Sequence, residues 1–493
     1  MFLKYVYLVL LCLVYKLNTA QMYFNNRYDN FNNGDITTGI NLFNGDYLIY
    51  GCAANSFSFY SLNLGIVDYT GTRIKNRTYN WGSNLIVPNI NKCIINSSSY
   101  FTIGGTNFYK PDTSLVFLWK LNKSLDSLEY HEFGFVNRTN QLNGIVKDSD
   151  KYIYMTGWVD SLYKNSDILL IKTDTSGNEI WKKKIGLPNY DETAWCIKIS
   201  SDNKLLICGN RRLHNNQATN GAFVLKADTN GAIIWEKYFP SNYGLAATGM
   251  VELPNGDIVA IAGKGYGSTV SRYELIKLDA SGNVVFDKTY GPMADRAEAY
   301  SLIQNQEGNL VAAGQMYYSA NNSVNGLMYV FNQNGDSIFS REYAVQPGSQ
   351  NYFRDLVQAP DKGYVFSGFI SPIFANGGTG NQDIWLLKTD STFCEGAFNC
   401  GYPTAITEAE ALEAGEMSVY PNPAKDVLYI DFVNNYEKRK IEIYDSFGKL
   451  VLNEDVSTQN SSLNIHHLQS GVYFYRIEDS EKVLQTNKLI IIK

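Results

Sequence analysis

A strand that ends in glycine recurs along this chain, and this repeat limits the possible folds more than any other feature. The strand ends fall at seven glycines: Gly51, Gly104, Gly157, Gly209, Gly263, Gly314 and Gly368. Their successive spacings are 53, 53, 52, 54, 51 and 54 residues. A period near 53 residues is long enough for four strands with their connections, which is one blade of a β-propeller. We therefore predict an all-β fold with a seven-bladed β-propeller.

The repeat also contains a β-hairpin, seen most clearly in DILLIKTDTSGNEIWKKKIG from Asp167, with near-copies from Gly221, Tyr273 and Gly326. The hairpin turns begin at Asp174, Asp228, Asp279 and Asn332 and contain Gly177, Gly231, Gly282 and Gly335. The Asp or Asn side chain can accept a hydrogen bond from the amide two residues on, and glycine supplies a positive φ. Each turn offers one carboxylate or amide, whereas a calcium loop needs several oxygens, so we interpret the turns as structural.

Strand order and ring closure follow from the same pattern. Lysines 182–184 mark the fourth strand of their unit as an exposed edge, so the chain runs from the central axis outward. The last unit lacks a fourth strand after 383–390, and residues 22–28 match the fourth strand at 284–290. We predict that the N-terminal strand completes the last blade and closes the ring, which removes free sheet edges.

Alternation of antiparallel strands puts the short first-to-second and third-to-fourth turns on one face and the longer connections on the other. Function tends to lie on such loops. The candidate ligand-binding residues on this long-loop face are Tyr109, Arg211, His214, Tyr266, Tyr317 and Phe369. Packing against neighbouring loops is the alternative interpretation for each of them.

Composition and motifs exclude several classes of function. The net charge of −6 and the pI near 5.4 argue against nucleic acid as a partner, because nucleic-acid binding depends on basic patches. The chain carries no HExxH, GxSxG or P-loop motif and only four histidines, so we expect no metal site. Carboxylate pairs for glycoside chemistry can come from distant segments, so an enzyme stays open.

The segments Asp174–Trp181 and Asp228–Trp235 resemble the docking motif of quinoprotein-type propellers, in which the Trp packs between blades. More broadly, residues 22 to 392 resemble secreted bacterial propeller repeats. Phe286 and Phe339 replace the Trp in later units, so the resemblance implies no cofactor here.

The N-terminus and the cysteines indicate export. Residues 1–20 are typical of a signal peptide, with Lys4, a short apolar run and Ala20 at the cleavage site, and the run is too short for a membrane span. We therefore expect no membrane span in the mature chain. The disulfide candidates are Cys196 with Cys208, across a predicted hairpin, and Cys394 with Cys400, in a small loop. Two free buried thiols are the alternative for the first pair.

The C-terminal part has a different character. We predict a propeller over 21–393, an acidic linker over 394–416 and a small Ig-like β-sandwich over 417–493. The last segment resembles the type A sorting domain of the bacterial type IX secretion system. The matching residues are Tyr420, Pro421, Asn422, Pro423, Gly448, Gly471 and Lys493.

This resemblance implies recognition by the type IX secretion machinery and passage through the periplasm to the outer surface or the medium. We therefore expect a secreted or cell-surface binding module that takes a glycan or a protein on its long-loop face. Two alternatives stay open: a propeller-type polysaccharide lyase or glycoside hydrolase, and a structural component of the cell surface.

Overall fold

The structure is a computed structural model of the 493-residue chain. It describes residues 23–29, 34–56, 59–79, 89–110, 113–149, 151–160, 165–241, 243–265, 270–292, 295–345, 348–371, 382–395, 417–420, 424–432, 439–445, 450–456, 460–478 and 483–491. The chain divides into two compact units, Met1–Thr404 (unit 1) and Ala405–Lys493 (unit 2). The division falls inside the segment predicted as a linker, most of which lies outside the described residues.

Unit 1 is all-β, and its described strands form groups of four antiparallel neighbours. Four groups are separate sheets: β2 (Asp35–Phe43), β3 (Asp46–Ser56), β4 (Phe59–Val67) and β5 (Arg73–Tyr79); β6 (Asn89–Ile95), β7 (Tyr100–Lys110), β8 (Thr113–Asn122) and β9 (Ser127–Phe133); β10 (Asn140–Lys147), β11 (Tyr152–Asp160), β12 (Ser166–Asp174) and β13 (Glu179–Ile185); and β14 (Tyr190–Ile199), β15 (Leu205–Leu213), β16 (Gly221–Ala227) and β17 (Ile233–Phe239). A one-turn 3-10 helix, η1 (Gln217–Thr219), lies between β15 and β16.

The remaining groups belong to one twelve-stranded sheet. They are β18 (Leu245–Glu252), β19 (Ile258–Gly265), β20 (Ser271–Leu278) and β21 (Val284–Tyr290); β22 (Arg296–Gln304), β23 (Leu310–Tyr318), β24 (Ser323–Phe331) and β25 (Ser337–Tyr343); and β26 (Gln350–Gln358), β27 (Tyr364–Ser371), β28 (Asp383–Thr389) and β1 (Phe24–Tyr28). Single parallel pairings, Ser271 with Arg296 and Val324 with Gln350, join these groups.

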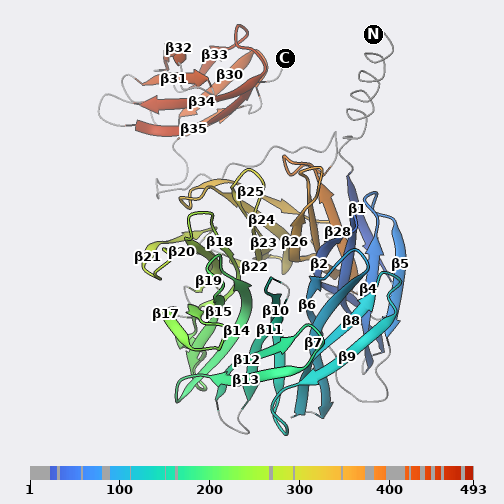
Figure 1. Ribbon diagram of the computed structural model, residues 1–493. Helices are drawn as coiled ribbons and strands as arrows, with labels where there is room; N and C mark the ends of the chain where they lie inside the picture. Colours follow the sequence, from blue (N-terminus) through green and yellow to red (C-terminus); the bar gives the residue numbers. More distant parts are fainter. Residues whose placement is uncertain are drawn as a thin grey trace, which may run out of the picture. The chain divides into compact units, whose positions relative to one another are not determined.

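The groups are arranged around a common centre, as in a β-propeller (Figure 1). The first strand of each group (β2, β6, β10, β14, β18, β22 and β26, here the inner strands) lies nearest the centre, and fourth strands such as β5, β9, β13, β17 and β21 lie at the periphery. Several side chains of β13 and β17 are exposed, whereas every residue of β16 is buried. The predicted order from the axis outward is therefore confirmed.

The predicted turn chemistry is also present. The four turn glycines, Gly177, Gly231, Gly282 and Gly335, have φ between 78° and 84°. The Asp174 carboxylate accepts from the amide of Ser176 at 2.9 Å and from that of Asn178 at 2.9 Å. The turns at Asp228, Asp279 and Asn332 repeat the first of these bonds at 2.9 Å. The side-chain amide of Asn178, which donates to the same carboxylate at 2.7 Å, and these backbone hydrogen bonds lower the pKa of Asp174.

The N-terminal strand completes the last group, as predicted. β1 pairs antiparallel with β28, from Phe24 opposite Lys388 to Tyr28 opposite Ile384. Phe24 and Tyr28 join a buried cluster with Tyr47 and Ile49 of the first group, so β1 connects the two ends of the repeat. The Tyr28 hydroxyl donates to the Gly71 carbonyl at 2.6 Å, which adds a polar contact to the first group.

The core of unit 1 lies between neighbouring sheets. Phe43 and Tyr50 of the first group pack with Phe101 and Phe117 of the second in one buried cluster. Similar clusters fill the spaces between later groups. Because each sheet is covered on both faces, its middle strands are apolar almost throughout.

Unit 2 consists of two small antiparallel sheets. One holds β29 (Met417–Tyr420), β30 (Val427–Phe432) and β33 (Asn460–Asn464), and the other holds β31 (Lys440–Asp445), β32 (Leu450–Asp455), β34 (Gly471–Glu478) and β35 (Val483–Ile491). Leu428 and Ile430 of the first sheet share a buried cluster with Ile441, Ile443 and Ile477 of the second. Unit 2 therefore has a hydrophobic core of its own.

Candidate functional site

The inner strands carry β-bulges at equivalent positions of the repeat. In six of them the pairing register skips one residue, and these bulge residues are Thr38, Asn91, Asn143, Trp195, Tyr300 and Arg354. In β18 the irregularity extends from Leu245 to Gly249. A bulge leaves its extra residue unpaired and changes the direction of its side chain. The repeat therefore brings the bulge residues of the five strands other than β6 to the same place around the centre.

The recurrent glycines lie inside the second strands rather than at their ends, which corrects the prediction from the sequence. The bulges explain five of these seven glycines. A Cβ on Gly368 would lie 1.7 Å from the Tyr352 carbonyl oxygen, and one on Gly209 would lie 1.9 Å from that of Thr193. Gly51, Gly157 and Gly314 meet an inner-strand carbonyl in the same way, at 2.0, 1.8 and 1.9 Å. Because the bulged strand approaches so closely, a side chain cannot fit at these positions.

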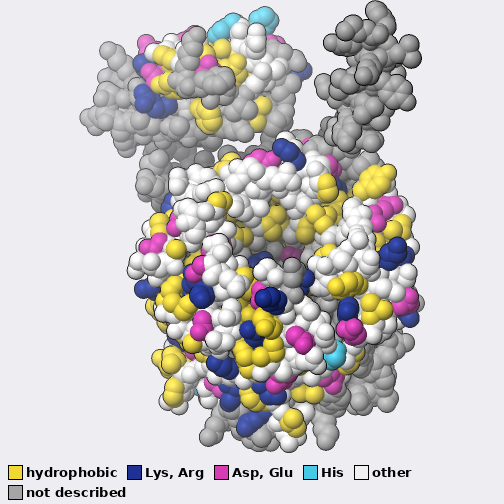
Figure 2. Space-filling view, in the orientation of Figure 1, with side chains coloured by type: hydrophobic (Ala, Val, Ile, Leu, Met, Phe, Trp, Pro, Cys, Tyr) yellow, Lys and Arg dark blue, Asp and Glu magenta, His cyan; other side chains and the backbone are white. Residues whose placement is uncertain are grey.

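A pocket of about 820 Å³ lies where the inner strands meet, in the middle of unit 1 (Figure 2). It is lined by Ile36, Thr37, Thr38, Cys52, Lys92, Phe108, Asn143, Trp195, Leu245, Ala246, Thr248, Glu298, Ala299, Tyr300, Arg354, Phe369 and Gln382. Phe108 and Phe369 stand near the ends of second strands, and Ile36 and Leu245 near the beginnings of inner strands. The long connections start and finish at these ends, so the pocket lies on the long-loop side.

Arg354 has an aromatic environment. Its guanidinium carbon lies 4.1 Å from the centroid of the Tyr300 ring, 5.2 Å from that of Phe369 and 5.5 Å from that of Tyr352. Phe369 stacks on Tyr352 with ring centroids 4.5 Å apart. In the part of the chain that the structure describes, no ion pair joins Arg354 to a carboxylate. The guanidinium lies over aromatic faces and also forms a hydrogen bond with the Tyr300 hydroxyl, and its other N–H donors can bind a ligand.

Glu298 is the one acidic residue among the described residues that line the pocket, and its partners occupy both oxygens. Oε1 accepts from Arg296 at 2.8 Å. Oε2 accepts from the Tyr300 hydroxyl at 2.7 Å and from Gln315 at 2.9 Å. Burial raises the pKa of Tyr300 above its usual range, so at neutral pH the hydroxyl keeps its proton and donates to Glu298.

Asp355, the residue after Arg354, connects several groups behind the pocket wall. Its carboxylate accepts from the Ser301 hydroxyl at 2.7 Å and from the Ile40 amide at 3.4 Å, and Lys92 lies 3.4 Å from it. These partners belong to β22, β2 and β6. The network fixes the strand on which Arg354 stands and gives Lys92 a carboxylate partner, which Arg354 lacks among the described residues.

Trp195 is the aromatic residue of the opposite part of the ring. It is 37% exposed, and its indole N–H donates to Asn210 at 2.8 Å, which fixes the orientation of the ring. Asn143 and Thr248 on the neighbouring inner strands donate to backbone carbonyls, both at 2.9 Å. This wall thus combines an oriented indole face with amide and hydroxyl groups.

The structure places one of the predicted long-loop residues at this pocket, namely Phe369. Arg211 is buried and paired with Glu192 at 2.5 Å and with Glu236, so its charge is used within the protein. Burial raises the pKa of Glu192. Tyr317 donates to Asn322 at 3.2 Å on the surface.

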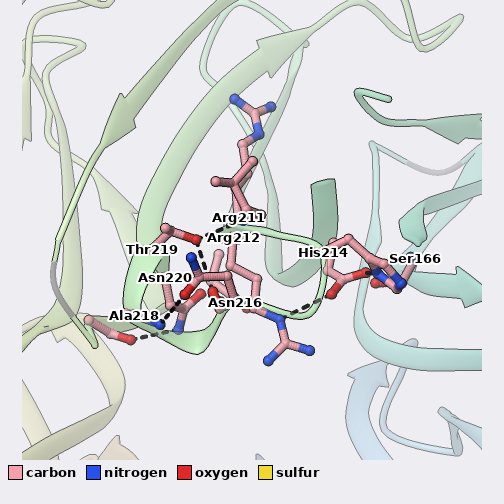
Figure 3. A network of polar contacts seen from close by, with 12 residues as sticks. Ser166, Arg211, Arg212, His214, Asn216, Ala218, Thr219 and Asn220 are labelled. Atoms are coloured by element: carbon pink, nitrogen blue, oxygen red, sulfur yellow. Dashed lines mark hydrogen bonds and ion pairs between the residues drawn. The ribbon is translucent and has the colours of Figure 1, made fainter. Parts of the chain in front are cut away.

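His214 belongs to a polar network at the end of β15 (Figure 3). Its Nδ1 lies 2.8 Å from Asp191, which also pairs with Arg212 at 3.2 Å and accepts from the Ser166 amide. Burial acts to raise the pKa of Asp191, but the hydrogen bonds from His214 and Ser166 outweigh it and lower the pKa. The network joins the end of β15 to the preceding group.

Two predicted ligand residues cannot be located. Tyr266 and the side chain of Tyr109 lie outside the described residues. Of the sorting residues, Gly471 begins β34 and the backbone of Tyr420 ends β29, whereas Pro421, Asn422, Pro423, Gly448 and Lys493 also lie outside.

The cysteines occupy the predicted positions. Cys196 and Cys208 are directly opposite each other in the β14–β15 pairing, and both are free thiols in this structure. The thiol contact with Cys208 lowers the pKa of Cys196. Cys394 is disulfide-bonded, and Cys400, its predicted partner, lies outside the described residues.

No group of three or more His, Cys, Asp or Glu side chains is arranged to hold a metal ion among the residues described. Nor does this part of the chain contain a helix with the length and hydropathy of a membrane span.

The sequence pattern did not identify the bulge residues as candidate site residues. Their signal is the same period: Thr38, Asn91, Asn143, Trp195, Thr248, Tyr300 and Arg354 follow one another at spacings of 53, 52, 52, 53, 52 and 54 residues. Five kinds of amino acid stand at these seven positions, while the glycine of the second strand recurs in every unit. A variable position facing an invariant glycine within an internal repeat is therefore the pattern that locates the pocket.

Comparisons with solved structures give distant likenesses. The extracellular domain of a hybrid two-component system from B. thetaiotaomicron is 11% identical, with a TM-score of 0.42 over 95% of this chain and 57% of that one. The β-propeller domain of the Trilobed protease from Pyrococcus furiosus is 12% identical, with a TM-score of 0.40 over 76% and 98%. An exo-β-1,3-galactanase from Phanerochaete chrysosporium is 10% identical, with a TM-score of 0.31 over 70% and 94%.

Comparison with curated proteins finds none that matches. The C-terminal resemblance is confirmed: residues 418–493 match the family described as "Secretion system C-terminal sorting domain". Unit 2 therefore carries a type IX C-terminal sorting domain, which indicates export to the cell surface or the medium and interaction with the type IX secretion machinery.

Proposed function

We propose that unit 1 is a seven-bladed β-propeller that works outside the cell as a binding module for a glycan or a protein. The ligand enters the central pocket from the long-loop side. The observation that carries this proposal is the set of bulge residues: six inner strands share a one-residue bulge, and the bulge side chains that line the pocket are a threonine, an asparagine, two aromatic residues and an arginine. A purely structural ring has no need of that variation.

The lining of the pocket favours binding over hydrolysis. Hydrolysis of a glycosidic bond usually needs two carboxyl groups, one on each side of the bond. Among the described lining residues, Glu298 is the one carboxylate, and hydrogen bonds already occupy both of its oxygens. Oriented aromatic, amide and hydroxyl groups are the usual lining of a small-ligand pocket, and 820 Å³ is within the ordinary size range of such pockets.

The proposal also assigns a role to each segment of the chain. Residues 1–20 act as a signal peptide, 21–393 form the propeller, 394–416 are a linker, and 417–493 form an Ig-like sandwich that the type IX machinery recognises. Support comes from the division of the chain inside the linker and from the two sheets that share a core in unit 2.

A glycan array tests the proposed function. Labelled full-length protein should bind at least one class of glycan, and Trp195→Ala should reduce that binding because it removes the exposed indole face. The control is Tyr69→Ala, which removes a 60% exposed aromatic residue from the β4–β5 turn, on the other face. If binding is found but the two variants weaken it equally, the central pocket is not the site.

A further inference from the structure

From the charges and rings of the pocket, we infer that its ligand is an oligosaccharide that carries a carboxylate. This inference rests on the proposed function and narrows it to acidic sugars, such as chains of uronic acids. The carboxylate would bind the N–H edges of Arg354, and a sugar ring would stack on Trp195.

The charge balance of the pocket gives the first reason. Two cations, Lys92 and Arg354, line it together with one carboxylate, Glu298. Lys92 is 3.4 Å from Asp355, and Glu298 is 2.8 Å from Arg296, so both already have partners of opposite charge. Among the described residues, Arg354 has no carboxylate partner in its half-buried place, which is unfavourable unless an anion binds it.

The geometry of Arg354 gives the second reason. Three aromatic rings surround the guanidinium at 4.1 to 5.5 Å and restrict its orientation. A guanidinium held by its flat face presents parallel N–H donors that match the two oxygens of a carboxylate.

The opposite wall indicates a sugar rather than an acidic peptide. Trp195 stands three groups before Arg354 in the ring, and in a ring of seven this is as far apart as two inner strands can be. Its indole is exposed and fixed by Asn210. Thr248 beside it has a hydroxyl oxygen that can accept from a sugar hydroxyl group. A ligand that reaches both walls must span the pocket, which requires several linked sugars.

The test uses two probes with the same sugar chain: a tetramer of galacturonic acid and its fully methyl-esterified form, in which a methyl group replaces the charge of each carboxylate. Binding of each to full-length protein is measured by titration calorimetry. Wild type should bind the acid about tenfold or more tightly than the ester, as expected for a charge-assisted bidentate contact. Arg354→Gln should abolish this preference, and Arg354→Lys should keep part of it. Trp195→Leu should weaken both probes alike.

Arg77→Gln is the matched control, since it removes the same charge from an exposed position on β5. It should leave the preference unchanged, and thermal melting confirms that each variant is folded. The inference would be overturned if wild type bound both probes with equal affinity, or if the preference for the acid survived in Arg354→Gln. In that case a loss of affinity in Trp195→Leu would still support binding in the pocket. Binding that neither pocket variant affects would refute the proposed function as well. Tighter binding of a tetraglutamate peptide than of the acid sugar would also overturn the inference, since it would show a peptide site.

Discussion

Replacement of Gly368 by alanine tests the link between the repeat and the pocket. The new Cβ would lie 1.7 Å from the Tyr352 carbonyl oxygen and 2.7 Å from its carbonyl carbon. The inner strand β26 would have to move by more than an ångström, and this strand carries Arg354. Overpacking of this kind costs about 3 kcal/mol, the upper end of the usual range.

The entropy of unfolding is about 2 cal/mol/K per residue, and the propeller of unit 1 has roughly 370 residues. A loss of about 1 kcal/mol in the free energy of unfolding therefore lowers the melting midpoint by about 1.3 °C. The loss of about 3 kcal/mol should lower the midpoint of unit 1 by about 4 °C. The control is Gly256→Ala. Its φ is 85°, and its new Cβ would lie 3.5 Å from the Ala280 Cβ, which is an ordinary contact, so backbone strain alone should lower the midpoint by about 1 °C. Scanning calorimetry gives the midpoints, and the titration described above gives the affinity. If Gly368→Ala melts and binds like wild type, the glycine is not required by the bulge.

Further predictions concern closure, redox state, pH and export. Phe24→Ala should destabilise unit 1 by about 3 to 5 kcal/mol, because it leaves a cavity in the cluster that joins the two ends of the repeat. Chemical denaturation measures the free energy of unfolding, and a loss below about 1 kcal/mol argues against closure by β1. We propose that Cys196 and Cys208 form a disulfide after export, so peptide mapping without reductant should find them linked, and two free thiols would end that proposal. Hydrogen bonds from Tyr444 and Lys440 lower the pKa of Glu442 from 4.5 to about 2. A lowered pKa stabilises the folded form above pH 4.5, so unit 2 should lose stability as the pH falls from 4.5 towards 2, and melting curves of Glu442→Gln should show a weaker dependence. Deletion of 417–493 should stop export and leave the propeller in the periplasm, which cell fractionation would show; normal surface amounts would contradict the role of the sorting domain.

The repeat made much of the fold predictable. Turn residues such as Asp174 and Gly177 act through bonds within a few residues, so local sequence determines them. The pairing of Phe24–Tyr28 with β28 was also predictable, because a missing strand at one end of a repeat has to be supplied from the other. The glycines were recognised as a repeat but were wrongly predicted to end their strands, which continue beyond them. Their cause at five positions, a carbonyl of the neighbouring strand, is a contact between strands and is not visible in the local pattern.

The candidate site was less predictable. The long-loop face was expected to hold the ligand through loop residues, yet Arg211 and His214 form ion pairs and hydrogen bonds within the protein. The pocket instead uses inner-strand residues such as Trp195 and Arg354. A strand residue in a regular ladder alternates between two faces, and only the bulge turns these side chains into the pocket, so periodicity alone does not reveal them.

A crystal structure of the full-length protein soaked with the galacturonic acid tetramer would test the central claim most directly. We predict density for the sugar in the central pocket, with a carboxylate against the N–H edges of Arg354 and a sugar ring on the face of Trp195. Sugar bound only on the outer strands or on unit 2, with the central pocket empty at saturating ligand, would contradict the claim.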